Sequence, residues 1–307
     1  MFAGDDEGYP FDKHIHVCTR KLANDSERES LRLLRSAIQD TSVYKNNAQV
    51  CARFCTDAML TRFLVGKAFK HKAALKLLVD ALTWWCKRNV FGFETAVGWD
   101  KRMSHEAETG KILISGKDKW GRPVVVFNND YQNTKNVDGQ MQFLAWYLNV
   151  ACRDMGIQDE SGATDVDKYV VFINLSNFSL WSAPSMRANK ETIFMLCSCF
   201  PERLGHCIIY RPPTVFEYFF NTFRFMMDKR TVAKLRFVMG KVDDMADGSP
   251  NDTYMRSLLG DDWKVLTGVD QPILRAKSAP GYDHATYWPQ LMTRINGYQA
   301  QEKIAGT

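Results

Sequence analysis

Residues 169–173 read Tyr-Val-Val-Phe-Ile, and this stretch carries the strongest strand signal in the chain. It is apolar throughout and rich in β-branched side chains, which is typical of a strand buried on both faces. Similar but weaker runs occur at 112–114, 124–127, 207–210 and 235–238, with helical patterns at 138–153 and 184–200 between some of them. Apolar strands that alternate with helices predict an α/β domain with a mainly parallel sheet.

The chain before this domain has helical spacing instead. Apolar residues recur at intervals of three and four within 26–38, 57–64 and 72–88. Ser26 and Glu29 have the spacing of a capping box at the start of the first helix. We therefore expect the following division of the chain: a flexible N-terminal arm (1–24), a helical module (25–108), the α/β domain (109–270) and a C-terminal tail with a candidate helix (271–307).

Residues 214–228, called the gate segment below, are rich in Phe and Met. At helical spacing, one face would carry Phe216, Phe219, Phe220, Phe223 and Met227. The opposite face is also apolar, because it carries Val215, Tyr218, Phe225 and Met226. A helix that is apolar nearly all round is buried in a core or lies between two apolar phases. The pattern alone leaves both interpretations open, core packing being the simpler one.

Composition and charge narrow the class of protein. The 307 residues carry a net charge of +5, which suits a phosphate-bearing ligand or an anionic membrane surface but is too small and too well mixed for nucleic-acid binding. No apolar run approaches the roughly 20 residues of a membrane span, and no secretory signal opens the chain. The eight cysteines form no paired CxxC motifs, which indicates reduced thiols and no zinc site. We expect a cytoplasmic monomer that contacts internal membranes peripherally.

Catalytic motifs are weak. Cys197 and Arg203 have the C-x5-R spacing of cysteine phosphatases. A phosphate-binding loop needs free backbone amides, however, and here Pro201 removes one and Glu202 adds a repelling charge. The chain also has no G-x-S-x-G or H-E-x-x-H motif. The sequence therefore predicts a protein that is not an enzyme.

Three segments carry a family resemblance. Residues 63–69 (FLVGKAF), with Trp84 and Trp85 further on, are similar to an RFLRARKF…W pattern, and residues 117–124 (KDKWGRPV) are similar to KDxxGRPV. Residues 200–205 (FPERLG), followed by Asp228, Thr231 and Lys234, are similar to YPERLG…D…T…K. In this order and spacing the set resembles the CRAL-TRIO family, in particular its phosphatidylinositol-transfer branch, over about residues 50–270.

The resemblance implies a helical N-terminal module packed on a lipid-binding α/β domain, whose sheet floors an apolar pocket and whose mobile helix, here the gate segment, closes it. It implies one phosphatidylinositol-type phospholipid as cargo, exchanged at membranes, with no cofactor and no metal. In members that bind phosphatidylinositol, a basic residue, the Glu of PERLG and a later Lys bind the inositol phosphate. The matching residues are Lys67, Glu202 and Lys234, with Thr231 beside the last.

Departures from the family pattern keep alternatives open. Lys67 stands where Arg is usual, and a lysine cannot bind a phosphate in the bidentate manner of an arginine. Val125 and Val171 stand where members that bind phosphatidylcholine carry hydroxyls, which weighs against choline lipid. The alternatives are a carrier of a sterol, tocopherol or retinoid-like ligand, and a membrane-targeting or interaction module without cargo. Phosphoinositide kinases are candidate partners, and the choice between delivering the lipid and presenting it to a kinase stays open.

Overall fold

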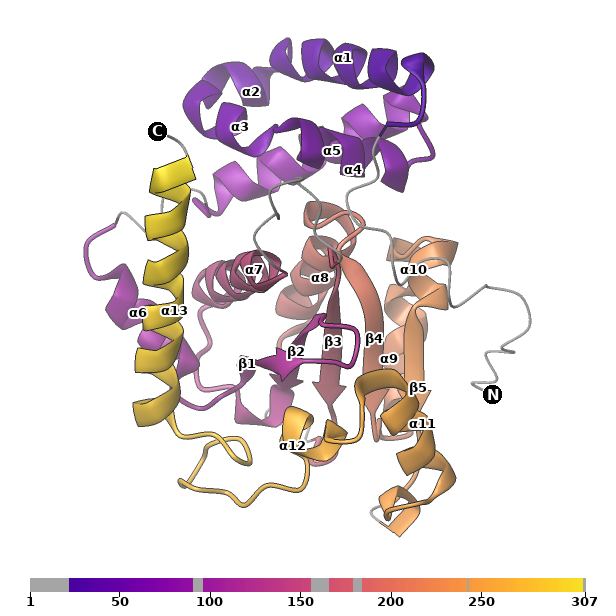
Figure 1. The fold of residues 1–307 in the computed structure, drawn as a ribbon, viewed down its shortest axis with the longest axis vertical. Coiled ribbons are helices and arrows are strands. Elements are labelled where there is room, and N and C mark those ends of the chain that lie inside the picture. Colours follow the sequence, from indigo (N-terminus) through magenta and orange to yellow (C-terminus); the bar gives the residue numbers. More distant parts are fainter. Residues whose placement is uncertain (1–21, 91–95, 156–165, 179–183, 242, 306–307) are drawn as a thin grey trace.

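The protein is described from a computed structural model, which covers residues 22–90, 96–155, 166–178, 184–241 and 243–305. Residues 1–21 of the expected arm lie outside the described residues. The first helices are α1 (Asp25–Gln39), α2 (Ser42–Asn46), α3 (Ala48–Phe54), α4 (Asp57–Gly66), α5 (His71–Lys87) and α6 (Trp99–Ala107). Figure 1 shows α1 to α5 gathered as a helical layer beyond the ends at which β3 (Tyr169–Asn174) and β4 (Leu204–Tyr210) begin.

The remaining chain builds the sheet and the helices around it. The strands are β1 (Ile112–Lys117), β2 (Pro123–Asn128), β3 (Tyr169–Asn174), β4 (Leu204–Tyr210) and β5 (Leu235–Val238). The longer helices are α7 (Val137–Asp154), α8 (Met186–Phe194), α9 (Val215–Phe223), α11 (Pro250–Leu259) and α13 (His284–Ala305). The short helical elements are η3 (Asn129–Tyr131), η4 (Met195–Cys199), η5 (Arg224–Met226), α10 (Lys229–Ala233), η6 (Asp243–Met245) and α12 (Trp263–Thr267).

The strand order β1-β2-β3-β4-β5 follows the sequence, with β1 antiparallel to β2 and every later pair parallel. Because the order advances in one direction, right-handed crossovers place α7, α8 and α9 on the same face of the sheet (Figure 1). Helices α11 and α12 cover the other face. The expected α/β fold with a mainly parallel sheet is confirmed.

The apolar runs of the strands are explained by burial on both faces. Alternate residues of a strand point to opposite faces. In β3, Val171 belongs to the core cluster shared with α7 and α8, whereas Val170 and Phe172 belong to the cluster shared with α11 and α12. A strand in this position has no solvent-facing side, which is why residues 169–173 lack polar alternation.

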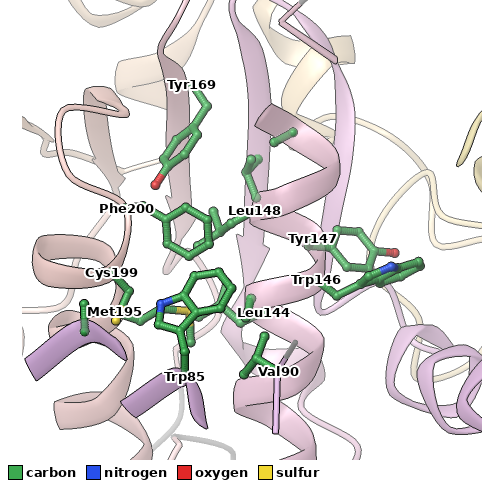
Figure 2. Packing of buried hydrophobic residues seen from close by; sticks show 14 of the residues in the cluster. Trp85, Val90, Leu144, Trp146, Tyr147, Leu148, Tyr169, Met195, Cys199 and Phe200 are labelled. Atoms are coloured by element: carbon green, nitrogen blue, oxygen red, sulfur yellow. The ribbon is translucent and has the colours of Figure 1, made fainter. Parts of the chain in front are cut away.

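The helical module packs on the α/β domain through a shared core, as expected. The Trp85 ring of α5 lies 5.4 Å from the Phe200 ring and 5.1 Å from that of Phe54. Figure 2 shows Trp85 beside Leu144 and Leu148 of α7, Met195 and Cys199 of η4, and Phe200. A buried ion pair joins Arg62 of α4 to Asp167, with 3.0 Å between Nη1 and Oδ2. This packing fixes the module against the start of β3 and the segment before β4.

The expected capping box at Ser26 is wrong. Helix α1 begins at Asp25, because the Asn24 side chain accepts a hydrogen bond from the Glu27 amide at 2.9 Å. The Glu27 carboxylate in turn accepts one from the Ala23 amide at 2.7 Å. Two capping-type patterns overlap in this segment, and the structure uses the earlier one.

Candidate functional site

A cavity of about 400 Å³ lies between the sheet and the helices α7, α8 and α9. Its floor comes from alternate residues of the parallel strands, namely Phe127, Val171, Ile173, Cys207 and Ile209. Its walls include Met141, Phe143 and Leu144 of α7, Ile193 of α8 and Leu196 of η4. A lining of this kind suits an apolar ligand.

The gate segment is not one continuous helix, so that expectation is wrong in its second half. Helix α9 ends at Phe223, the 3-10 turn η5 follows, and Met227 has an extended backbone. The interruption allows Asp228 to cap α10, because its carboxylate accepts a hydrogen bond from the Thr231 amide at 2.7 Å and a cap needs an extended conformation.

The inner face of the gate segment closes the cavity. Phe216, Phe220, Phe223 and Met227 all line it. Phe220 packs edge-on against the Phe237 ring of β5, with 5.3 Å between the centroids. The side chain of Phe219 lies outside the part of the chain that the structure describes. The predicted helical face therefore does point inward at each position whose side chain is described.

The outer face of the gate segment is apolar and exposed. Phe225 is 83% exposed and is not part of the cavity lining, whereas Tyr218 (80% exposed) and Val215 (49% exposed) also contribute to the lining. The simpler interpretation, a helix buried on all sides in a core, is therefore wrong. The gate segment separates an apolar cavity from solvent, which is the arrangement expected of an element that meets an apolar phase on either side.

The predicted head-group residues come together at one end of the cavity. We call this the basic end and define it by Lys67, Glu202, Arg230, Thr231 and Lys234. Glu202 precedes β4 and Lys234 precedes β5, so both lie at the amino edge of the parallel strands. Thr231 lines the cavity, whereas Lys67, Glu202 and Lys234 do not, although Lys67 and Lys234 act electrostatically on Cys197, which does.

Arg230 contacts both Glu202 and the end of α4, and it was not predicted from the sequence as a site residue. Its Nη2 lies 3.5 Å from Oε1 of Glu202 and donates a hydrogen bond to the Gly66 carbonyl at 2.6 Å. Glu202 itself has a left-handed backbone, with φ of 57°, a conformation that non-glycine residues adopt at a cost and that often marks functional sites. The position of Arg230 directly before Thr231 in KRTVAK was the available signal.

Burial and nearby charges shift the pKa values of two groups at this end of the cavity. Burial lowers the pKa of Lys234, and Glu202 partly opposes this shift. Burial also raises the pKa of Cys197, which lines the cavity, to about 12, although Lys67 and Lys234 lower it. The thiol is therefore protonated at neutral pH and cannot serve as a nucleophile. Arg203 is engaged elsewhere, since it donates to the Asp167 carbonyl at 3.0 Å.

A second group of polar residues lies at the opposite end of the cavity and was also missed. We call it the neutral end and define it by Glu106, Lys111, Gln132, Thr134 and Gln140. The Lys111 ammonium is paired with the Glu106 carboxylate and donates to Oγ1 of Thr134 at 3.1 Å. Lys111, Gln132 and Gln140 line the cavity.

Membrane spans and metal clusters are both absent from the described part of the chain. None of the helices that the structure describes is long and apolar enough to cross a membrane. Within the described ranges, no three His, Cys, Asp or Glu side chains are grouped as metal ligands.

Comparison with known proteins identifies the domain to which the cavity belongs. Residues 107–254 match the family model of the CRAL/TRIO domain. The chain is 27% identical over 238 residues to a CRAL-TRIO domain-containing protein of Schizosaccharomyces pombe, which covers 77% of this chain and 20% of that protein. It is 24% identical over 246 residues to the phosphatidylinositol transfer protein PDR17 of Saccharomyces cerevisiae, covering 76% of this chain and 61% of PDR17.

The chain thus spans less than two thirds of the length of either relative. The crystal structure of Sfh5 has the same fold, with a TM-score of 0.56 at 15% identity over 90% of this chain and 99% of that one. The expected family resemblance is confirmed for the central part of the chain: residues 107–254 form a CRAL-TRIO domain, which is the domain of a family of lipid-binding and lipid-transfer proteins.

Proposed function

We propose that the protein carries one phosphatidylinositol-type phospholipid in this cavity and exchanges it at membranes. The acyl chains occupy the apolar part, and the phosphate lies at the basic end. The observation that carries the proposal is the meeting of an apolar cavity with the residues that match the family's head-group motif, Lys67, Glu202, Thr231 and Lys234, at one end of it.

The charge balance of the basic end favours an anionic head group. Lys67, Arg230 and Lys234 outnumber the carboxylates of Glu202 and Asp228, whose charges act on the same groups. A phosphodiester carries one negative charge and would offset part of the cost of burying Lys234. The similarity to PDR17, which is named as a phosphatidylinositol transfer protein, supports the same choice.

Individual side chains have distinct roles in this proposal. Arg230 offers a planar fork that can bind a phosphate through two parallel hydrogen bonds, which the ammonium of Lys67 cannot do. Glu202 accepts hydrogen bonds from inositol hydroxyls. Val171 lines the cavity floor and has no hydroxyl, so a choline lipid finds no matching donor at this position.

Loading requires the gate segment to move. The cavity of about 400 Å³ is near the lower limit of ligand pockets, which range over about 300–1,000 Å³. Displacing Phe216, Phe220 and Phe223 outward enlarges it and exchanges their apolar contacts for acyl chains. The exposed Tyr218 and Phe225 then contact the membrane, so that no acyl methylene, worth about 0.8 kcal/mol each, has to enter water.

In this proposal the protein acts at the cytoplasmic surface of internal membranes as a monomer. It needs no cofactor and performs no covalent step, because the transfer is an exchange between two apolar environments. Phosphoinositide kinases are candidate recipients of the lipid.

A vesicle assay tests the proposal. Labelled phosphatidylinositol in donor vesicles should move to acceptor vesicles in the presence of the protein, and Lys234→Ala should slow the transfer strongly. Lys76→Ala is the matched control, because Lys76 is an exposed α5 residue paired with Asp80 at 2.6 Å. Absence of transfer by the wild type, or an equal decrease in both variants, contradicts the proposal.

A further inference from the structure

The gate segment continues directly into α10, and α10 contacts the helical module. Met227 lines the cavity, and Asp228 caps α10. The Nη2 atom of Arg230, in the first turn of α10, donates to the Gly66 carbonyl at 2.6 Å and lies 3.5 Å from the Val65 carbonyl. Figure 1 shows α10 at the end of the sheet that faces the helical module. One partly exposed side chain thus joins the gate segment to the end of α4.

The Gly66 carbonyl bonds Arg230 because the chain after α4 turns away from the helix axis. The Lys70 amide, which would continue the helix, bonds the Lys67 carbonyl at 3.0 Å instead. The Phe69 amide bonds a carbonyl within α4 at 2.8 Å, and Phe69 has a left-handed φ of 58°. The last carbonyls of a helix carry partial negative charge, so a guanidinium placed there is favourable. Arg230 therefore caps α4 from a distant part of the chain.

This contact differs in kind from the others that hold the gate segment closed. On the cavity side, Phe220 packs on Phe237 with 5.3 Å between the ring centroids, and an acyl chain can replace such an apolar contact. On the outer side, Phe225 is exposed. The bond from Arg230 to Gly66 is polar, so an acyl chain cannot replace it. Outward movement of the gate segment moves α10 and strains this bond.

We propose that Arg230 is a latch: its bonds to the end of α4 keep the gate segment closed, and the cavity opens only when they break. The helical module thereby acts as the anchor of the gate segment. The second N–H of Nη2 faces Oε1 of Glu202 at 3.5 Å, so a phosphate can share the guanidinium without displacing the Gly66 carbonyl. The inference goes beyond the proposed function, because it concerns the control of opening and holds for any cargo.

The reactivity of a cavity thiol tests the latch in the lipid-free protein. Cys207 lines the cavity and is 6% exposed, and burial raises the pKa of its thiol to about 12. It should therefore react with N-ethylmaleimide only when the cavity opens. Arg230→Gln should accelerate this reaction about tenfold, since it removes a charge-assisted hydrogen bond from the closed form. Mass spectrometry of digested samples gives the rate at each cysteine.

Two controls separate a latch from a general loss of stability. Lys229→Gln removes the same charge from an exposed neighbour in α10 and should change the Cys207 rate less than about twofold. Cys51, 0% exposed in the core of the helical module, reports global unfolding, and Arg230→Gln should leave its rate unchanged. The inference is overturned if both variants accelerate Cys207 equally, if neither does, or if Arg230→Gln accelerates Cys51 as much as Cys207.

The outcome does not depend on phosphatidylinositol, because no lipid is present during the reaction. If Arg230→Gln accelerates Cys207 alone but the wild type transfers no labelled phosphatidylinositol between vesicles, the latch stands and the proposed function fails. If the wild type transfers the lipid but Arg230→Gln reacts at Cys207 like Lys229→Gln, the proposed function stands and the latch fails.

Discussion

The two ends of the cavity are built from similar residues and differ in charge balance. Each has a buried or partly buried lysine beside a glutamate, Lys234 with Glu202 at the basic end and Lys111 with Glu106 at the neutral end. At the basic end further cations, Lys67 and Arg230, leave an excess of positive charge. At the neutral end the charges of Lys111 and Glu106 cancel each other. The comparison shows that a buried lysine does not by itself determine the ligand. The net charge of the residues around the lysine determines which ligand it can bind.

The two ends also differ in how the chain builds them. The neutral end comes from a compact stretch that surrounds β1, β2 and the start of α7 (Figure 1). The basic end joins distant segments, and Arg230 links α10, directly after the gate segment, to the end of α4 through the Gly66 carbonyl. A movement of the gate segment therefore changes the basic end and leaves the neutral end in place.

The largest expected difference between the ends is in stability. Glu106→Gln leaves the Lys111 ammonium buried without its counter-charge and should lower the free energy of unfolding by about 3 kcal/mol. Glu202→Gln should cost under about 1 kcal/mol, because Glu202 is 23% exposed and the cations around it are partly solvated. Urea unfolding of both variants measures the difference, and equal costs would show that the ends are electrostatically alike.

The next effect is on cargo affinity. The double variant Arg230→Ala/Lys234→Ala should bind phosphatidylinositol at least about 100-fold more weakly, because it removes two charge-assisted hydrogen bonds of about 1.5–3 kcal/mol each. Uptake of hexadecane, which has no head group, should be unchanged. Equilibrium binding from vesicles gives both values, with Lys76→Ala as the control. A parallel decrease for both ligands would mean that the double variant damages the whole cavity.

A smaller effect concerns the membrane side of the gate segment. Phe225→Ser should slow lipid transfer about tenfold, since one Phe side chain contributes about 1.5–3 kcal/mol when it leaves water. The stability of the protein should change by less than about 0.5 kcal/mol, because Phe225 is exposed. Leu33→Ser, an exposed apolar position on α1, is the control in the same transfer assay. Equal slowing by both substitutions would remove the gate segment from the docking step.

The smallest effect is a pH dependence of phosphatidylinositol binding at the basic end. Burial lowers the pKa of Lys234 from its ordinary value of 10.5, so the ammonium loses its proton within the range below that value. Affinity for phosphatidylinositol should fall as pH rises through this range. The unfolded chain binds more protons there, so Lys234 should raise the stability of the empty protein over the same range. Hexadecane uptake should change less, because the hydrocarbon carries no charge and makes no hydrogen bond, and a parallel fall for both ligands in a pH titration would contradict this assignment.

The sequence was most informative where one physical effect dominates. Continuous burial produced the apolar strands, and the inward face of α9 followed from helical spacing. The end of α9 was not predicted, because the apolar pattern continues past Phe223 while Asp228 imposes the start of a new helix. Helices α6, α11 and α12 were missed, since they are short and their buried faces depend on tertiary contacts.

For the site, motif resemblance identified the residues that match known head-group positions, and the structure places them around one end of the cavity. It could not identify Arg230, which stands outside the motif, or Gln132, which lines the cavity at the neutral end. Both emerge only when segments distant in the sequence are brought to the same cavity.

Native mass spectrometry of the purified protein tests the central claim most directly. The wild type should carry one bound molecule per chain with the mass of a phosphatidylinositol species, and Arg230→Ala/Lys234→Ala should lose it. A wild-type protein that carries no lipid, or a bound phospholipid of another class that both proteins retain equally, would contradict the assignment of the basic end as a phosphatidylinositol site.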